Sequence, residues 1–352
     1  MRRKELIVNQ RKINDNNKPF IIAELSANHG GDLDRAKQSI EMAANAGVSA
    51  IKLQTYTPDT ITLNNDGNDF QIKDEKSLWK GKSLYELYSE ASTPWSWHEK
   101  IFEYAKSRGL LSFSSPFDES AVDFLETLNV PAYKIASFEN NHLPLIEKAA
   151  FTGKPLIIST GLASLSALDD AVKTARNAGC NDLILLKCTS SYPASPSKTN
   201  IKTIPHLKQL FKTEVGLSDH TKGIGVAVAS VALGATVIEK HLTLDRSEGG
   251  VDSAFSLEPK ELKNLVIETN NAWKSLGEIT YGATDEERNN SAFKRSIYTS
   301  KDIKNGDNFS AENIKVVRPG FGADPKYYNL ILGKKAKKDY KEGTALTLDM
   351  II

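Results

Sequence analysis

The stretch VIEKHLTLD, residues 237–245, begins as a buried β-strand and then turns into a run of ionisable residues. Its first two residues are branched and apolar, whereas Glu239, Lys240 and His241 follow in direct succession. Because side chains alternate along a strand, Glu239 and His241 share one face and Lys240 points the other way. Charge inside a protein core is costly unless it is paired or used in chemistry. The stretch therefore predicts a strand whose end opens into a polar site.

Seven further short apolar segments precede this stretch. They are FIIAEL (20–25), SAIKLQ (49–54), LLSFSS (110–115), AYKIAS (132–137), PLIIST (155–160), DLILLK (182–187) and EVGLS (214–218). Between them lie amphipathic helical patterns such as 33–47, 96–109 and 165–179, and each of these ends on a glycine, a common helix terminator. Strands that alternate with helices indicate a parallel sheet. Eight such units in roughly 250 residues are typical of a TIM barrel, so the predicted fold class is α/β with a (β/α)₈ barrel.

The chain is predicted to contain two domains joined by a linker. The barrel is assigned to residues 1–276, and residues 55–93 are expected to form an extended loop after its second strand, on the face where such barrels carry their active sites. The polar stretch 277–292 is assigned to the linker. Residues 293–352 contain the short strand-like runs RSIYTS, IKVVRP and TALTLD and are predicted to form a small β-rich domain.

Composition excludes several classes of protein. The 352 residues are 40% hydrophobic and 25% charged, which is ordinary for a globular enzyme. A formal net charge of +1 argues against a general nucleic-acid or membrane-surface binder. The two cysteines lack zinc-ligand spacing and fit a reducing compartment. The N-terminal segment lacks an apolar region of signal-peptide length, and no later stretch is apolar enough to span a bilayer, so a cytoplasmic protein is expected.

All eight strand segments finish in polar or ionisable residues. In chain order these are Glu24; Lys52 and Gln54; Ser114 and Ser115; Lys134 and Ser137; Ser159 and Thr160; Lys187, Thr189 and Ser190; Ser218, Asp219 and His220; and Glu239 and His241. Because TIM-barrel enzymes build their active sites at the carboxyl ends of the strands, these side chains are predicted to meet at the barrel mouth.

The residue types at the barrel mouth predict two kinds of site. Lys52 and Lys134, with several hydroxyls nearby, are suited to bind phosphate. His220 and His241 end neighbouring strands, close enough to share a divalent metal ion. Imidazole combined with oxygen ligands suits Mn²⁺, Fe²⁺, Co²⁺ or Zn²⁺.

Each of these groups also has a structural explanation. A single histidine at a strand end is usually a satisfied structural residue, although a pair on adjacent strands favours metal binding. Lys134 could simply form an ion pair, for which Glu24 and Glu139 are the candidate partners. Cys180 and Cys188 are expected to be small core residues, because neither has an activating neighbour in sequence.

Eight motifs, taken in order, resemble those of the sialic acid synthase family. They are IIAELSANHGGDLDRA, AIKLQTY, FSSPFD, YKIAS, PLIISTG, KCTSSYPA, GLSDHT and IEKHLTLD. The tail from about Arg295, with NIKVVRPGFG, resembles the antifreeze-like (SAF) domain that closes these enzymes, so the resemblance covers nearly the whole chain. Within the family, LQTYTPDTITL, LWKGKSLYELYSEASTPWSWH and CTSSYPA look most like the pseudaminic acid synthase branch.

The resemblance implies an enzyme that condenses phosphoenolpyruvate with an open-chain N-acetylated amino sugar and releases phosphate by C–O cleavage. For the pseudaminic branch the acceptor would be 2,4-diacetamido-2,4,6-trideoxy-L-altrose and the product a nonulosonic acid. The family also implies a divalent cofactor, with Mn²⁺ expected and Mg²⁺ or Co²⁺ as alternatives, and a domain-swapped homodimer.

The resemblance further implies roles for individual residues. Phosphoenolpyruvate would be held by Lys52, Ser115, Lys134, Ser137, Ser159 and Ser218. His220 and His241 would bind the metal ion, Glu24 would act near its water, and Gln54 would lie beside the reacting carbons. The sugar would be held by Glu139, Tyr192 and Asp252, and by Arg318 from the tail of the other subunit. Ser190 stands where the neuraminate-forming branch has Asn, which favours a different sugar.

Three other functions remain open at this point. The chain could be an N-acetylneuraminate or legionaminate synthase with a different amino-sugar acceptor. A Schiff-base aldolase on the same barrel, using Lys134 or Lys52, is more remote. A non-catalytic sugar-binding protein is disfavoured, because so many ionisable groups in one barrel mouth are costly without chemistry.

Overall fold

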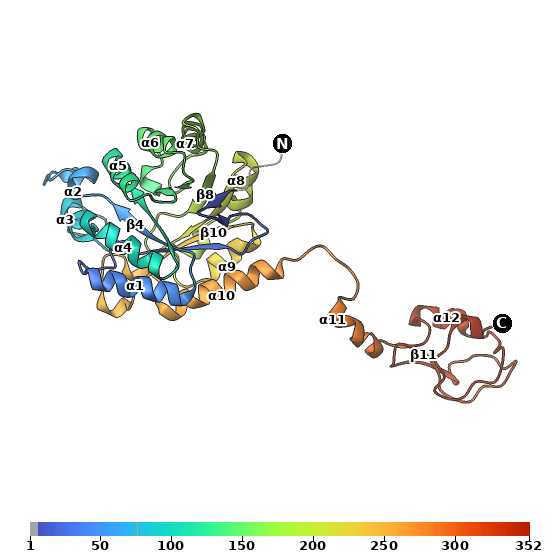
Figure 1. The fold of residues 1–352 in the computed structure, drawn as a ribbon. Helices are drawn as coiled ribbons and strands as arrows, with labels where there is room; N and C mark the ends of the chain where they lie inside the picture. The colour runs from blue at the N-terminus through green and yellow to red at the C-terminus, as the bar shows by residue number, and fades with distance from the viewer. Residues whose placement is uncertain (1–5, 76) are drawn as a thin grey trace. The chain divides into compact units, whose positions relative to one another are not determined.

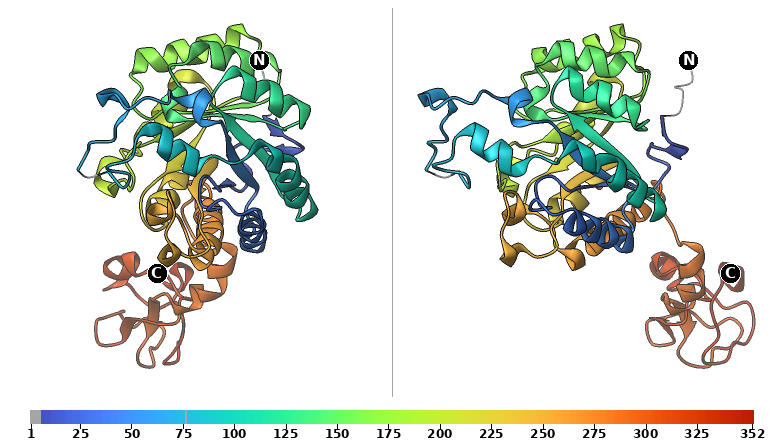
Figure 2. Two further views of the ribbon diagram at one scale, coloured as in Figure 1. Left: turned by 90° about the vertical axis from the view of Figure 1, so that its left-hand side faces the viewer. Right: turned by 60° about the vertical axis from the view of Figure 1, so that its left-hand side comes forward.

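The computed structural model describes residues 6–75 and 77–352. The chain forms two compact units, and the boundary between them falls after Gly277. In the first unit a closed barrel of eight parallel strands is surrounded by helices (Figures 1 and 2). The strands are β3 (Phe20–Glu24), β4 (Ala50–Thr55), β5 (Leu111–Pro116), β6 (Tyr133–Ile135), β7 (Leu156–Ser159), β8 (Leu183–Cys188), β9 (Glu214–Asp219) and β10 (Val237–His241). These are the eight segments expected from the sequence, so the predicted TIM barrel is confirmed.

Helices follow the barrel strands and cover them from outside (Figure 2). They are α1 (Leu33–Ala46), α4 (Trp95–Ser107), α5 (Glu119–Thr127), α6 (Leu143–Phe151), α7 (Leu165–Asn177), α8 (Thr203–Phe211), α9 (Gly225–Ala232) and α10 (Pro259–Ser275). The helix α1 shows how local sequence sets its limits. Asp32 caps its first turn by accepting from the N–H groups of Asp34 and Arg35, and Gly47 ends it in a left-handed conformation.

The barrel closes where its last strand pairs with its first. In this β10–β3 seam, His241 is the register partner of Glu24, and Glu24 in turn is the partner of Lys52 on β4. All five residues of β10 are buried, as are all five of β3. Because parallel strands run in the same direction, their polar carboxyl ends meet at one face of the barrel.

The segment after β4 is more ordered than the sequence predicted. Residues 55–93 were expected to form an extended loop, yet they contain α2 (Pro58–Ile61), a 3₁₀ turn (Asn68–Phe70) and α3 (Leu84–Ala91). Ser83 and Glu86 form a capping box that starts α3. A short hairpin, β1 (Ile7–Val8) with β2 (Arg11–Lys12), precedes the barrel.

The second unit is small and has its own apolar core. Its strands β11 (Ser296–Thr299) and β12 (Ile314–Val317) pair antiparallel, and it also contains α11 (Asp285–Arg288) and α12 (Tyr328–Ile331). The third strand-like run, TALTLD, was predicted wrongly. It contributes only an isolated bridge from Ala345 to Tyr298 and then turns into a 3₁₀ helix at Leu348–Met350.

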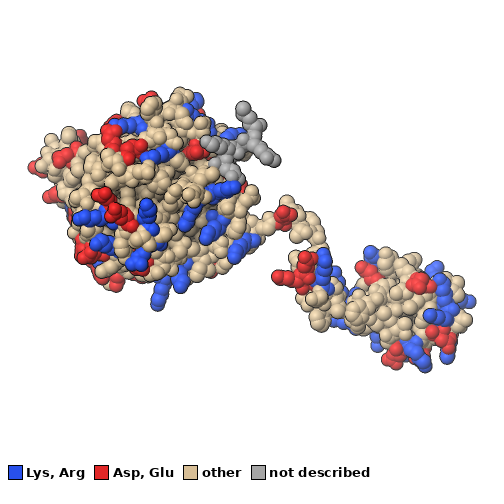
Figure 3. Space-filling model, viewed as in Figure 1, with Lys and Arg blue, Asp and Glu red and all other residues tan. Residues whose placement is uncertain are grey.

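Surface charge agrees with the near-neutral composition. On the face seen in Figure 3, basic and acidic side chains are interspersed over the barrel unit. Among the described helices, none combines the length and the apolar character that a membrane span requires.

Candidate active site

A cavity of about 280 Å³ lies at the carboxyl ends of the barrel strands. Twelve of the residues singled out in the sequence line it: Glu24, Lys52, Gln54, Lys134, Ser137, Glu139, Ser159, Tyr192, Ser218, His220, His241 and Asp252. The strand periodicity argued from residues 237–245 is also correct. Glu239 and His241 both line the cavity, whereas Lys240 points away from it and pairs with Asp219 at 2.7 Å.

Two buried lysines and two buried carboxylates form the floor of this cavity. Lys52 pairs with Glu24, and its Nζ also lies 3.7 Å from Glu239 Oε2. Lys134 Nζ lies 3.5 Å from Glu239 Oε1, so Glu239 bridges the two lysines. The sequence had suggested Glu24 or Glu139 as the ion-pair partner of Lys134. That prediction was wrong, because the partner is Glu239. The strand order places Glu239 of β10 across the barrel from β6, which sequence neighbours could not reveal.

The pKa values of the two carboxylates on the cavity floor are shifted in opposite directions, downward for Glu239 and upward for Glu24. Burial opposes ionisation of Glu239, but Lys134 and Lys52 outweigh it and hold the pKa of Glu239 well below its ordinary value. Burial raises the pKa of Glu24; Lys52 opposes this shift and the charge of Glu239 reinforces it. Burial also lowers the pKa of Lys134, against the attraction of Glu239. The site thus holds one firmly ionised carboxylate and one that can keep a proton.

Hydroxyl groups surround the two lysines. Lys52 donates to Ser115 Oγ at 3.1 Å, and Ser218 donates to Glu239 at 2.9 Å. The backbone N–H of Gly161 donates to Ser137 Oγ at 3.2 Å. The buried hydroxyl of Ser159 has no hydrogen-bond partner among the described residues. Two cations beside free hydroxyl groups are the groups that an oxyanion such as phosphate needs.

The imidazoles of His220 and His241 face each other, with ring centroids 5.4 Å apart. His220 Nδ1 lies 3.2 Å from the carbonyl oxygen of Thr189, which places the proton of a neutral ring on Nδ1 and leaves Nε2 as the free ligand atom. His241 Nδ1 is buried without a hydrogen-bond partner in the described structure. Burial, followed by the neighbouring His220, lowers the pKa of His241 far below its ordinary value, so this ring is neutral at pH 7.

These two rings fit a divalent cation. Both rings line a polar cavity, and the orphaned buried nitrogen of His241 is the kind of group that a bound cation satisfies. Within residues 6–75 and 77–352, no three or more His, Cys, Asp or Glu side chains are arranged as a complete ligand set.

Cys188 is more than the small core residue expected from the sequence. It is buried, yet it lines the cavity, and its Sγ lies 3.8 Å from His220 Nδ1. Burial opposes ionisation of the thiol, but the hydrogen bond and charge of His220 outweigh it and lower its pKa to about 7. Cys180 is also buried and contacts backbone carbonyls, as expected for a core residue.

The other half of the cavity is lined by polar groups and by apolar side chains of residues 55–93. Glu139, Tyr192 and Asp252 supply polar groups, and Tyr192 packs at 5.8 Å from Trp79 between ring centroids. Trp79 donates from its indole to the carbonyl of Val251 at 2.9 Å, so residues 55–93 are tied to the segment after β10. The apolar wall also contains Ile61, Leu87 and Phe117.

Glu139 gives a first testable prediction, because burial raises its pKa to about 7 although Lys134 opposes the shift. A folded pKa above the ordinary 4.5 means that the native state holds this proton more tightly than the unfolded state. Stability is therefore lost as the pH rises from 4.5 to 7. Glu139→Gln is expected to stabilise the protein at pH 8 by about 1–3 kcal/mol and to have little effect at pH 4.5. Urea denaturation at the two pH values measures this difference, and an equal gain at both would contradict the assignment.

Three predicted substrate-binding residues do not line this cavity, and the first, Ser115, lies just behind Lys52, from which it accepts a hydrogen bond. Ser190 is half-buried beside Cys188, with 3.9 Å between Oγ and Sγ, but it does not line the cavity. Arg318 belongs to the second unit, where it is exposed. Glu239 was correctly placed at the barrel mouth from the sequence, but it was given no catalytic or binding role there. Ser26, which lines the cavity as well, lies within the motif IIAELSANHGGDLDRA but was given no role either.

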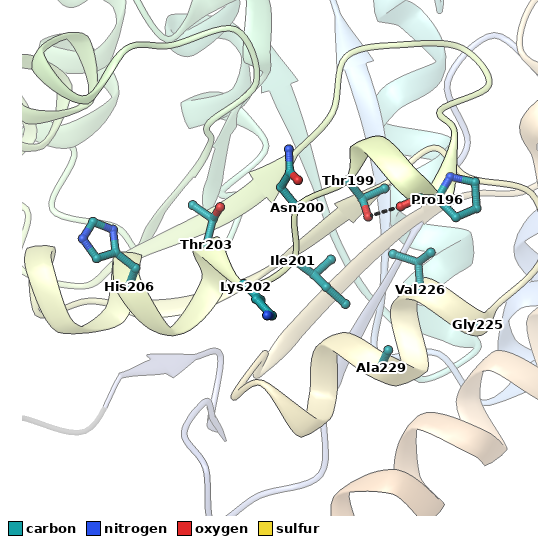
Figure 4. Close-up of a pocket in the computed structure, with 10 residues that line it drawn as sticks. All are labelled: Pro196, Thr199, Asn200, Ile201, Lys202, Thr203, His206, Gly225, Val226 and Ala229. Carbon is teal, nitrogen blue, oxygen red and sulfur yellow. Dashed lines mark hydrogen bonds between the residues drawn. The ribbon is translucent and has the colours of Figure 1, made fainter.

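A second hollow, of about 600 Å³, lies between α8 and α9 (Figure 4). Of the ten described residues that line it, Lys202 and His206 are the two ionisable ones. Figure 4 shows Thr199 turned to its own backbone, where its hydroxyl donates to the carbonyl of Pro196 at 2.8 Å. Carboxylates, lysines and a pair of histidines converge in the barrel mouth, and they do not converge here.

The chain is similar to known proteins along its whole length. Residues 39–281 match the model of the NeuB family, and residues 294–352 match that of the SAF domain. A pseudaminic acid synthase of Campylobacter jejuni is 49% identical over 333 residues, which cover 95% of this chain and 96% of that protein. A pseudaminic acid synthase of Helicobacter pylori is 43% identical, with 95% and 98% covered. A solved N-acetylneuraminic acid (sialic acid) synthetase from Leptospira borgpetersenii, 35% identical, superposes with a TM-score of 0.72 over 82% of this chain and 95% of that one.

Proposed function

This chain belongs to the NeuB family, and from that premise we propose that it catalyses the pseudaminic acid synthase reaction. Phosphoenolpyruvate condenses with 2,4-diacetamido-2,4,6-trideoxy-L-altrose, water is consumed, and a nonulosonic acid and inorganic phosphate are released. The methylene carbon of phosphoenolpyruvate, C3, forms the new C–C bond with the aldehyde carbon of the sugar. The C–O bond of phosphoenolpyruvate breaks, and its oxygen leaves with the phosphate.

The observation that carries this proposal is the meeting of two lysines and two histidines in one buried cavity. Lys52 and Lys134 lie at the two carboxylate oxygens of Glu239, and His220 and His241 form a neighbouring pair. A trianionic substrate needs such cations, and an aldehyde acceptor needs a group that polarises its oxygen. A barrel that only bound a neutral sugar would gain nothing from burying these charges.

The lysines and serines would bind the anionic substrate. Lys52 and Lys134 would neutralise its phosphate and carboxylate, with hydroxyl donors from Ser115, Ser137, Ser159 and Ser218. The negative charge of the bound substrate would weaken the ion pairs of Glu239 with both lysines. Each lysine would then exchange one anionic partner for another and stay paired. Glu24, whose pKa is raised by burial, is suited to exchange a proton with the water that adds to C2, the carbon that carried the phosphate. Gln54 would lie beside the reacting carbons.

His220 and His241 would hold a divalent cation, for which we propose Mn²⁺, with Mg²⁺ or Co²⁺ as alternatives. Once bound, the cation would supply Lewis-acid polarisation of the sugar aldehyde. The chain's own contribution is to orient His220 through the carbonyl of Thr189 and to keep His241 neutral through burial.

The acceptor would occupy the half of the cavity bounded by residues 55–93. Glu139, Tyr192 and Asp252 offer hydrogen bonds to hydroxyl and amide groups, whereas Trp79 and Leu87 offer apolar surface. A sugar with two acetamido methyls and a deoxy terminal carbon has three methyl groups to bury, which this wall accommodates better than a hydroxylated chain end. This favours the pseudaminic acceptor over N-acetylmannosamine.

We also propose that the site is completed by the tail of a second chain in a domain-swapped homodimer. Phe138 lines the cavity and is 57% exposed at its rim, which leaves an apolar edge for a cover. In the tail, Arg318 is exposed and Phe321, three residues later, is 69% exposed. The Arg318 guanidinium is suited to donate to the carbonyl of an N-acyl group.

Arg318→Ala is therefore expected to raise KM for the sugar about 10-fold and KM for phosphoenolpyruvate less than twofold. The physical reason is that the lost guanidinium would donate to the acceptor alone. Steady-state kinetics with each substrate varied in turn measures both constants. Mixing Arg318→Ala chains with His241→Ala chains should restore part of the activity, because one site of each mixed dimer has both residues. Equal changes in both constants, or no recovery in verified heterodimers, would contradict the lid.

The decisive test of function is a screen of purified protein with phosphoenolpyruvate, Mn²⁺ and three acceptors. The acceptors are the diacetamido-trideoxy-altrose, its legionaminate-forming counterpart and N-acetylmannosamine, and the products are identified by mass. We expect phosphate release with the first acceptor, chelator-sensitive and at the highest kcat/KM. Preference for another acceptor would reassign the substrate, and no phosphate release with any acceptor or metal would overturn the function.

A further inference from the structure

We propose that Ser26 is a positioning residue that sets the Asp252 carboxylate for the acceptor sugar and ties it to Glu24. This inference rests on the proposed function, since it assigns Asp252 to the acceptor. Ser26 lies two residues after the end of β3 and lines the cavity, and only 2% of its surface is exposed.

The backbone at Ser26 is in an unfavourable conformation. Its φ is +46°, in the left-handed region that residues with a side chain rarely adopt. A glycine would occupy this position without that cost. Strained residues persist where the surrounding structure holds them, and they cluster at functional sites. A glycine would lack the hydroxyl group of Ser26. We therefore expect the hydroxyl to have a role that compensates for the strained backbone.

Both hydrogen-bond donors of Ser26, its hydroxyl and its backbone N–H, donate to carboxylates that line the cavity. Its hydroxyl donates to Asp252 Oδ2 in a short hydrogen bond, and its backbone N–H donates to Glu24 Oε1 at 2.9 Å. Asp252 Oδ2 also lies 3.9 Å from His241 Nδ1. One residue in a left-handed turn thus connects the carboxylate proposed for water to the carboxylate proposed for the sugar.

The segments that carry these groups are joined at a second point. Asn28 donates from its amide to the carbonyl of Leu242 at 2.7 Å and to Ser256 Oγ at 2.8 Å. Ser256 in turn donates to the backbone carbonyl of Asp252 at 2.7 Å. The backbone around Asp252 is therefore held independently of Ser26. What the Ser26 hydroxyl adds is a hydrogen bond to Oδ2 that orients the carboxylate itself.

Two substitutions separate the hydroxyl from the backbone strain. Ser26→Ala and Ser26→Gly both remove the hydroxyl and keep the N–H that donates to Glu24, but only Gly suits a positive φ. We expect kcat/KM for the acceptor to fall about 10- to 100-fold in both, mainly through a higher KM for the sugar. KM for phosphoenolpyruvate should change less than twofold. The Gly variant should unfold at a temperature equal to or above that of the Ala variant.

Ser230→Ala is the matched control. Ser230 is a fully buried serine whose hydroxyl donates to the carbonyl of Ala227 at 2.7 Å within α9, away from the cavity. Its removal should leave both KM values unchanged. The inference is overturned if the Ser26 variants keep wild-type kinetics, if both KM values rise together, or if Ser26→Gly alone restores the sugar KM. Wild-type protein that releases no phosphate with any acceptor overturns the proposed function itself, and the role of Ser26 with it.

Discussion

Replacing His220 or His241 by Ala is expected to lower turnover by about 1000-fold or more and to abolish tight binding of a divalent cation. The two rings are the paired imidazoles of the cavity, at 5.4 Å between centroids. Loss of either leaves one imidazole, which cannot hold the cation against water. The fold should survive, because neither ring donates to the strand ladder. Steady-state phosphate release measures turnover, and Mn²⁺ titration followed by electron paramagnetic resonance measures binding.

His206→Ala provides the control for this experiment. His206 is exposed and lines the hollow between α8 and α9, so its loss should alter neither turnover nor Mn²⁺ binding. Circular dichroism of all three variants shows whether the barrel has folded. A His220→Ala or His241→Ala protein that is active and free of metal would contradict the role assigned to the pair.

Lys134→Met is expected to lower kcat/KM for phosphoenolpyruvate by about 100- to 1000-fold. The side chain is almost fully buried, and its ammonium ion has Glu239 as its ion-pair partner at 3.5 Å. Without it, the substrate phosphate and carboxylate would enter a site that holds Glu24 and Glu239 against a single lysine. Fluorescence titration with phosphoenolpyruvate separates lost binding from lost chemistry.

Lys240→Met is the matched control, because Lys240 is equally buried but faces away from the cavity. It should destabilise the protein by roughly 3–5 kcal/mol, since Asp219 is left unpaired in the core, while KM for phosphoenolpyruvate stays within twofold. Borohydride treatment of wild type with substrates should leave the protein mass unchanged. A reduced adduct at Lys134 or Lys52 would favour the Schiff-base aldolase and contradict the electrostatic role.

The barrel could be predicted because its evidence is local. Each of the eight strands is a short apolar run, and each ends in a polar residue at the point where parallel strands must meet. The pairing of His220 with His241 followed from their places on adjacent strands nine and ten of the structure. These inferences need only periodicity and the known direction of a parallel sheet.

What could not be predicted depends on distances across the barrel. Lys134 finds Glu239 because β6 and β10 face each other over the cavity, and no spacing in sequence encodes that approach. Cys188 contacts His220 because the neighbouring strands β8 and β9 bring the two residues together, although they are 32 positions apart in the sequence. Residues 55–93 were expected to be extended, because α3 is only two turns long and its apolar face is narrow. The conformation of Ser26 depends on Asp252, which is distant in sequence.

The seam at which His241 pairs with Glu24 has a consequence for biosynthesis. Since β3 leaves the ribosome early and β10 leaves it late, a growing chain contains Glu24 long before His241 has been synthesised. Catalytic competence would then arise in a single final step, when the last strand docks. A circular permutant with new termini at this seam should fold into the same barrel. Its active-site residues would, however, be synthesised in a different order.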